Sequence, residues 1–131
     1  FGKHGKLLKL VDEIIAGYRE GLGDAWDNSI ILTLTEFGRT VKENGTWGTE
    51  HGYGSAGLLA GGAITKSRVI SKWPGLAENE QFEKRDLMST IDYRSVCAAC
   101  IEKSIGLDHD LIADKVFFTP ELPRVYDYIF S

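Results

Sequence analysis

Four side chains able to do chemistry lie within one glycine-rich stretch of the sequence. Glu36 and Arg39 stand at its start, and Glu50 and His51 follow further along. Carboxylates and imidazoles bind divalent ions and transfer protons, whereas a guanidinium forms paired hydrogen bonds with a phosphate or sulfate. Glycines let backbone N–H groups approach an anion closely. These residue types therefore indicate a metal or acid–base site for an anionic substrate.

Each of these residues also has a structural interpretation. The glycines then serve only to turn the loop, and His51 hydrogen-bonds a backbone carbonyl. Arg39 then forms an ordinary ion pair with Glu36 or Glu43. Loop positions carry function more often than core positions do, but the residues alone leave both interpretations open.

Other motifs carry less weight. Residues 52–57 match the dinucleotide fingerprint G-x-G-x-x-G, which needs a strand before it and a helix after it. Here a loop precedes the motif and a strand is expected to follow, so nucleotide binding is the least favoured function. Cys97 and Cys100 form a C-x-x-C pair within a predicted helix, where we expect buried thiols in the core. His109 has no neighbouring ligands and is expected at the surface.

Short apolar segments predict the strands that position the candidate site. Residues 29–35 are apolar on both alternating faces, which is typical of a central parallel strand covered by helices. Residues 55–61 predict a second buried strand, and residues 69–71 a third. Ligand sites of open α/β sheets gather at the carboxyl ends of parallel strands. Glu36 directly follows the first strand, so we expect its carboxylate at that edge.

Helices are predicted on both sides of this region. Residues 6–22 repeat apolar side chains at spacings of three and four, which predicts a helix with one buried face. Ser89 begins a capping-box pattern, and the helix that it opens is expected to end at Gly106. Asp108 or Asp110 is expected to cap one more short helix.

Composition excludes several classes of protein. The 131 residues are 43% hydrophobic and 26% charged, which is typical of a folded globular domain. The net charge is −4, and no cluster of basic residues marks a nucleic-acid surface. The apolar runs are too short to span a membrane, and the two cysteines cannot form a disulfide framework. We therefore expect that the protein does not bind nucleic acid and has no membrane-spanning segment.

Four segments in order resemble a known family. They are residues 35–40, 48–52, 73–76 and 92–94, which read Thr-Glu-Phe-Gly-Arg-Thr, Gly-Thr-Glu-His-Gly, Trp-Pro-Gly-Leu and Asp-Tyr-Arg. Together they resemble the C-terminal part of the bacterial family called domain of unknown function 1501. That family is grouped with the alkaline phosphatase and sulfatase superfamily. The likeness covers nearly the whole chain.

The resemblance implies a fold and a reaction. The fold is an alkaline-phosphatase-like α/β three-layer sandwich with a mainly parallel sheet, and metal ions sit at its carboxyl edge. Glu36 and His51 occupy positions of metal ligands, with Glu50 as a further candidate, and the metal is zinc, manganese or magnesium. Arg39 stabilises the anionic oxygens of the ester. The implied function is metal-dependent hydrolysis of phosphate or sulfate esters.

Two positions depart from the family pattern. Phe37 stands where the superfamily has a metal-binding side chain, and a phenyl ring cannot bind a metal. Tyr53 replaces what is often a second histidine. These departures favour an alternative, in which the protein is a catalytically eroded binding or scaffold protein on the same fold.

The resemblance also implies that residues 1–131 are the C-terminal portion of one domain. Superfamily hydrolases place the first metal-binding aspartate and the nucleophile in the N-terminal half, so these residues alone are not expected to form an active hydrolase. We expect exposed apolar surface, covered by the missing N-terminal half or by self-association. Family members are often exported, which implies a periplasmic or extracytoplasmic location.

Overall fold

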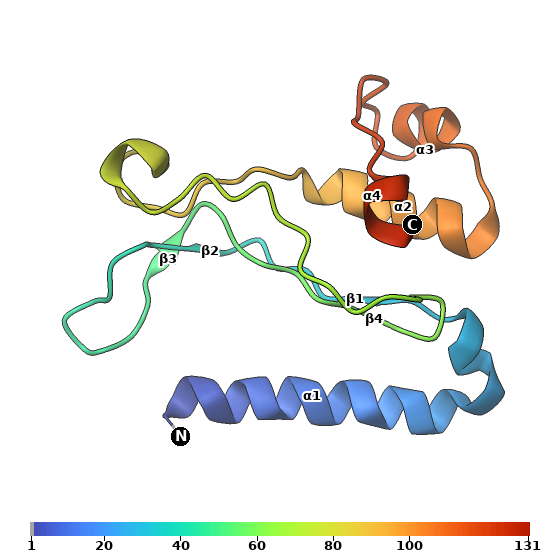
Figure 1. The fold of residues 1–131 in the computed structure, drawn as a ribbon, viewed down its shortest axis with the longest axis horizontal. Coiled ribbons are helices and arrows are strands. Elements are labelled where there is room, and N and C mark those ends of the chain that lie inside the picture. The colour runs from blue at the N-terminus through green and yellow to red at the C-terminus, as the bar shows by residue number, and fades with distance from the viewer. Residues whose placement is uncertain (1) are drawn as a thin grey trace.

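The computed structural model describes residues 2–131, which form a long helix, an extended ribbon and a cluster of helices (Figure 1). The elements are, in chain order, α1 (Lys3–Leu22), the 3-10 helix η1 (Gly23–Asn28), β1 (Ile31–Leu32), β2 (Gly38–Arg39), β3 (His51–Gly52), β4 (Leu59–Ala60), the 3-10 helix η2 (Glu78–Glu80), α2 (Tyr93–Ile105), α3 (His109–Lys115) and α4 (Tyr126–Phe130). None of the helices in the described part is long and apolar enough to cross a membrane.

The ribbon is one long antiparallel hairpin. β1 pairs with β4 so that Ile31 lies opposite Ala60, and β2 pairs with β3 so that Arg39 lies opposite His51. Between the two pairs, the backbone N–H of Thr33 donates to the Leu58 carbonyl at 2.9 Å. The two pairs are therefore successive parts of the same ribbon, and the loop between β2 and β3 forms its tip (Figure 1).

The prediction of a mainly parallel sheet is wrong. The structure contains two small antiparallel two-stranded sheets in place of an alkaline-phosphatase-like three-layer sandwich. Parallel neighbours need a crossover of roughly a dozen residues or more, usually a helix. The chain between β1 and β4 contains no helix, so it turns back on itself and the strands run in opposite directions. Residues 69–71 form no strand.

The predicted N-terminal helix is confirmed as α1, but the prediction that one of its faces is buried is wrong. It begins at Lys3, three residues before the expected start. None of its residues is buried, and Leu10 and Ile14 are each 50% exposed. An amphipathic pattern shows which face needs cover, but it does not say what provides it.

The hydrophobic core lies among the C-terminal helices, where α2 packs against α3 and α4. Its buried members are Ala98, Ile112, Ala113 and Leu122, with Ile101 and Phe117 packed against them. The expectation that His109 lies at the surface is wrong, because its side chain is buried. The ring Nε2 has a polar partner there, the Leu122 carbonyl oxygen at 2.8 Å. A carbonyl only accepts hydrogen bonds, so this nitrogen donates and fixes the loop that carries Leu122.

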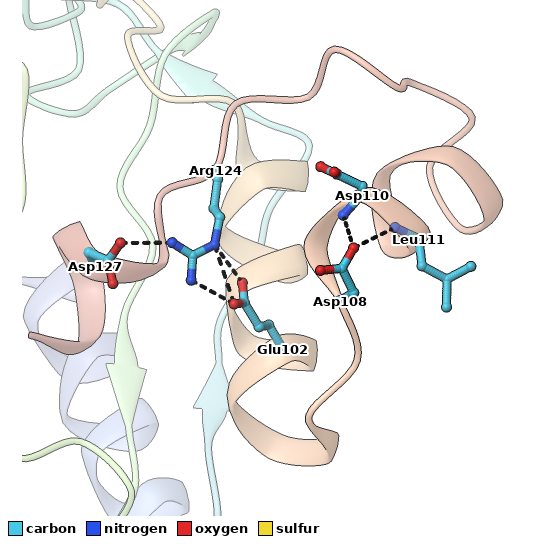
Figure 2. Close-up of polar contacts among 6 residues, drawn as sticks. All are labelled: Glu102, Asp108, Asp110, Leu111, Arg124 and Asp127. Carbon is cyan, nitrogen blue, oxygen red and sulfur yellow. Dashed lines mark hydrogen bonds and ion pairs between the residues drawn. The ribbon is translucent and has the colours of Figure 1, made fainter.

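An ion-pair network closes the same cluster. The Arg124 guanidinium lies 2.6 Å from Glu102 Oε1 on α2 and 2.7 Å from Asp127 Oδ2 on α4 (Figure 2). Asp108 accepts hydrogen bonds from the backbone N–H groups of Asp110 and Leu111 at the start of α3, as its predicted cap role requires (Figure 2).

The ends of α2 follow local sequence signals in part. Gly106 ends the helix in the left-handed conformation with φ 68°, as predicted. The N-cap is Asp92 and not Ser89, because the Asp92 carboxylate accepts from the Arg94 N–H at 2.9 Å. Cys97 and Cys100 are partly buried on this helix, and burial raises the pKa of Cys100 to about 11. Burial also raises the pKa of Cys97, so both thiols are protonated packing groups near neutral pH.

The Asp92 cap predicts a pH-dependent contribution to stability. We expect Asp92→Ala to lower the free energy of unfolding by about 1 kcal/mol at neutral pH. The hydrogen bond from the Arg94 side chain, with smaller contributions from its backbone N–H and charge, holds the pKa of Asp92 below its ordinary value. A lowered carboxyl pKa stabilises the fold above the unfolded pKa of about 4. That stabilisation is lost as the pH falls through the folded pKa.

Urea unfolding followed by circular dichroism at neutral and acidic pH measures this effect. The difference between wild type and Asp92→Ala is expected to shrink in acid. Asp92→Asn is the matched control, because it retains an oxygen for the cap but carries no charge. A difference that is the same at both pH values would contradict the assignment.

Candidate functional site

Glycines let the backbones of the ribbon come unusually close at the candidate site. Gly38 and Gly52 lie opposite each other, and a Cβ atom at Gly38 would overlap the backbone carbonyl of Tyr53. A Cβ atom at Gly52 would overlap the carbonyl of Arg39, and one at Gly54 would lie 2.7 Å from the Leu87 oxygen. Much of the glycine density is therefore needed for contact between backbones.

A third segment fixes the other edge of β2. The N–H of Leu87 donates to the Arg39 carbonyl at 3.0 Å, and the N–H of Val41 donates to the Arg85 carbonyl at 2.9 Å. Asp86, between them, is buried and forms an ion pair with Arg85 at 2.7 Å. The backbone of Arg39 is thus held from both sides.

Arg39 and His51 are cross-strand neighbours. They lie directly opposite each other on β2 and β3. Residues opposite each other in an antiparallel pair project from the same face, with Cβ atoms about 5 Å apart. The Phe37 ring lies 4.7 Å from the His51 ring, centroid to centroid, and so supports the imidazole from one side. The structure therefore brings together two of the four predicted site residues.

The Arg39 guanidinium is not neutralised by a carboxylate. Within residues 2–131 it forms no ion pair, so neither Glu36 nor Glu43 is its partner. Its one side-chain hydrogen bond within that range goes from an NH1 group to the neighbouring Gly38 carbonyl, at 3.1 Å. The ion-pair alternative is therefore not realised, and the positive charge remains available to an anion.

Glu36 and Glu50 lie apart from this pair. Glu36 is exposed at the bend before β2. Glu50 lies across the ribbon from Thr40, whose backbone N–H donates to the Glu50 carbonyl at 3.2 Å. The Glu50 carboxylate accepts a hydrogen bond from the Asn44 side chain at 2.6 Å. Successive residues of a strand point to opposite faces, so Glu50 and His51 project from different faces of the ribbon.

The predicted ligands do not form a complete metal site within this chain. A protein site for a divalent ion such as zinc uses three or four side-chain ligands. Among the residues that the structure describes, no three His, Cys, Asp or Glu side chains are grouped in a way that could hold an ion. The set Glu36, Glu50 and His51 therefore does not by itself fit a divalent metal.

Sequence reasoning missed the structural roles of two residues that shape the site, Asn44 and Tyr53. Asn44 organises the tip of the ribbon, because its side-chain oxygen accepts from the N–H groups of Thr46 and Gly48. Tyr53 stacks on Phe82 with ring centroids 4.0 Å apart, so it packs the ribbon against the segment before α2. The Asn-Gly run was a signal for the tight turn; no local pattern indicated the stacking partner.

Comparison with known protein families gives a match. The family model described as Protein of unknown function (DUF1501) matches residues 1–111. No curated protein and no solved structure matches the chain.

Proposed function

The chain belongs to the DUF1501 family, and from this premise we propose that it acts on phosphate or sulfate esters, with the ribbon as the anion-binding part of the site. One observation carries the proposal. Arg39 and His51 lie side by side across the ribbon, and the guanidinium is free of ion pairs with residues 2–131.

The chemistry of the pair suits a tetrahedral oxyanion. A guanidinium presents two parallel N–H groups to two oxygens of a phosphate or sulfate. The neighbouring imidazole donates an N–H to the same group or exchanges a proton with a reacting oxygen. Phe37 limits the rotation of the imidazole through its ring contact. The ester oxygens are therefore held between a fixed charge and a group that transfers protons.

Metal-dependent hydrolysis remains part of the proposal only if further ligands come from outside residues 1–131. Glu36, Glu50 and His51 are the candidate ligands, and zinc, manganese or magnesium the candidate ions. Because these side chains are not gathered into a three-ligand group, we assign no step to a metal. The nucleophile and the remaining ligands are predicted to belong to an N-terminal half of the domain.

Calorimetric titration with phenyl phosphate and phenyl sulfate tests the proposed site. We expect Arg39→Ala to weaken binding of both esters about tenfold or more, because a hydrogen bond to a charged group contributes about 1.5–3 kcal/mol. Arg39→Lys is expected to retain part of the affinity, since it keeps the charge but loses the paired geometry. Arg19→Ala, which removes an equal charge from α1, is the matched control. Equal affinities of wild type and Arg39→Ala would contradict the proposal.

The alternative is a binding protein without catalysis. The contact of Phe37 with His51 favours it, because the phenyl ring fills space beside the imidazole. The two functions are separated by metal analysis and turnover of phenyl phosphate with added zinc, manganese or magnesium, in protein that includes the predicted N-terminal half. Turnover with a stoichiometric ion supports the hydrolase. Ester binding without turnover and without a stoichiometric metal ion supports the binding protein.

A further inference from the structure

α1 presents an apolar face that no other part of the described chain covers. Within residues 2–131, the element with which α1 makes substantial contact is η1, which directly follows it. In Figure 1 the helix runs apart from the α2–α4 cluster that holds the core. Val11 and Ile15 on this face are partly buried. Its other large apolar side chains are between 38% and 56% exposed; they are Leu7, Leu8, Leu10, Ile14, Tyr18 and Leu22.

The two ends of this face have complementary shapes. The N-terminal half projects leucines, whereas Gly17 and Gly21 follow Ile14 at the same spacing of three and four residues. These glycines border a shallow, open depression of the surface, which is also lined by Ile14, Tyr18 and Leu22. Within residues 2–131, and apart from adjacent residues and the surrounding helix backbone, no atom comes within 4 Å of the position that a Cβ would take on either glycine. One end of the face therefore carries protruding side chains and the other a hollow that receives them.

Charges along the helix are also divided between its ends. Lys3 and Lys6 lie at the start, and no acidic residue occupies the first turn. At the other end, Glu20 lies in the last turn beside Arg19, and Asp24 follows in η1, so two acidic residues stand against one basic residue there. The helix dipole disfavours cations at the N-terminus, so this distribution does not stabilise the isolated helix. Lys9 pairs with Glu13 within α1, but these four end charges form no ion pair with any of residues 2–131.

We propose that α1 associates with α1 of a second copy of this chain in an antiparallel pair that crosses at Ile14. This arrangement places Leu7 of one copy over the hollow beside the partner's Gly21. It also brings Lys6 near the partner's Glu20 and Lys3 near the partner's Asp24. Two-fold symmetry makes each contact twice, because the same face is used by both copies.

A parallel pair does not use these features. It sets Leu7 against Leu7 and Gly21 against Gly21, which leaves the hollow empty. It also places the lysines of both copies at the same end. An antiparallel second copy is therefore the occupant that matches both the shape and the charge of the face. The inference is independent of the proposed ester site on the ribbon.

Sedimentation velocity over a range of protein concentrations tests the association. Wild type is expected to form a dimer. Gly21→Leu is expected to weaken the dimer about tenfold or more, because it fills the hollow that receives Leu7. The open space around Gly21 lets the folded monomer accept the new side chain. Ala16→Leu adds the same side chain to the opposite face of α1 and is expected to leave the dimer unchanged.

Charge exchange tests the antiparallel direction. Lys6→Glu and Glu20→Lys are each expected to weaken the dimer, and the double variant is expected to restore it, because each opposite pair is then reversed but intact. Circular dichroism of every variant verifies that the helices are retained. A monomeric wild type at all concentrations would overturn the proposal. So would a dimer that Gly21→Leu leaves intact, or a double variant weaker than both single ones.

Discussion

Replacing Gly38 by alanine is expected to destabilise the ribbon by about 3 kcal/mol, the upper end of the usual cost of overpacking. The added methyl group would overlap the backbone carbonyls of Gly52 and Tyr53, which cannot rotate away as a side chain would. The strands must therefore separate at the point where Arg39 faces His51. We expect the same variant to lose the ester affinity of the site, because the two side chains no longer share a fixed geometry.

Gly45→Ala is the matched control for this variant. It makes the same substitution at the tip of the same ribbon, where no atom lies within 4 Å of the new methyl group. Amide hydrogen exchange of residues 29–62 and urea unfolding measure the local and global stability. We expect faster exchange in Gly38→Ala and wild-type exchange in Gly45→Ala. Equal protection of the ribbon in both variants would show that the close backbone approach is not required.

Replacing Ile112 by alanine is expected to lower the free energy of unfolding by about 2–5 kcal/mol. The Ile112 side chain is fully buried, and two of its neighbours in the core are the alanines Ala98 and Ala113. Small neighbours have few atoms that can move into the space left behind. The cavity is therefore expected to persist, and α3 to lose its attachment to α2.

Leu111→Ala provides the comparison for this cost. Leu111 precedes Ile112 on α3 but is 48% exposed. Its truncation removes a similar number of carbon atoms, yet is expected to cost less than about 1 kcal/mol, because it leaves no cavity. Urea unfolding monitored by circular dichroism measures both variants. Equal losses of stability would contradict the assignment of the core to the α2–α4 cluster.

The helices were largely predictable because their signals are local. The capping pattern of Asp108 and the left-handed glycine at Gly106 lie within one turn of the ends that they define. The start of α2 was placed three residues early, since Ser89 and Asp92 both fit an N-cap by residue type. His109 was misplaced, because its partner is a carbonyl thirteen residues away.

The sheet was not predictable from the same evidence. Residues 29–35 and 55–61 are apolar in either a parallel or an antiparallel arrangement. The apolar run at 29–35 was interpreted as a central parallel strand, and the resemblance to superfamily hydrolases favoured the same arrangement. The pairing depends on contacts such as Thr33 with Leu58, which are distant in sequence. The glycine-rich stretch was interpreted as serving an anion or the turns of a loop. At Gly38 and Gly52 the structure gives another reason, the close contact between backbones.

The candidate site residues were chosen by residue type, but their arrangement was not predicted. Arg39 and His51 were identified by residue type, and the register of β2 with β3 determines that they are neighbours. Glu50 was grouped with His51 because they are adjacent in sequence. In an extended strand this adjacency places them on opposite faces. Register therefore brings Arg39 and His51 together, and alternation separates Glu50 from them.

Titration of the protein with inorganic phosphate, followed by nuclear magnetic resonance, tests the central claim most directly. The observed signals are the side-chain Nε–H of Arg39 and the ring C–H groups of His51, at constant pH and ionic strength. The proposed site predicts that both signals shift to saturation with one dissociation constant, and that Arg39→Ala abolishes the response of His51. Signals that do not shift, or a His51 response that survives in Arg39→Ala, would contradict it.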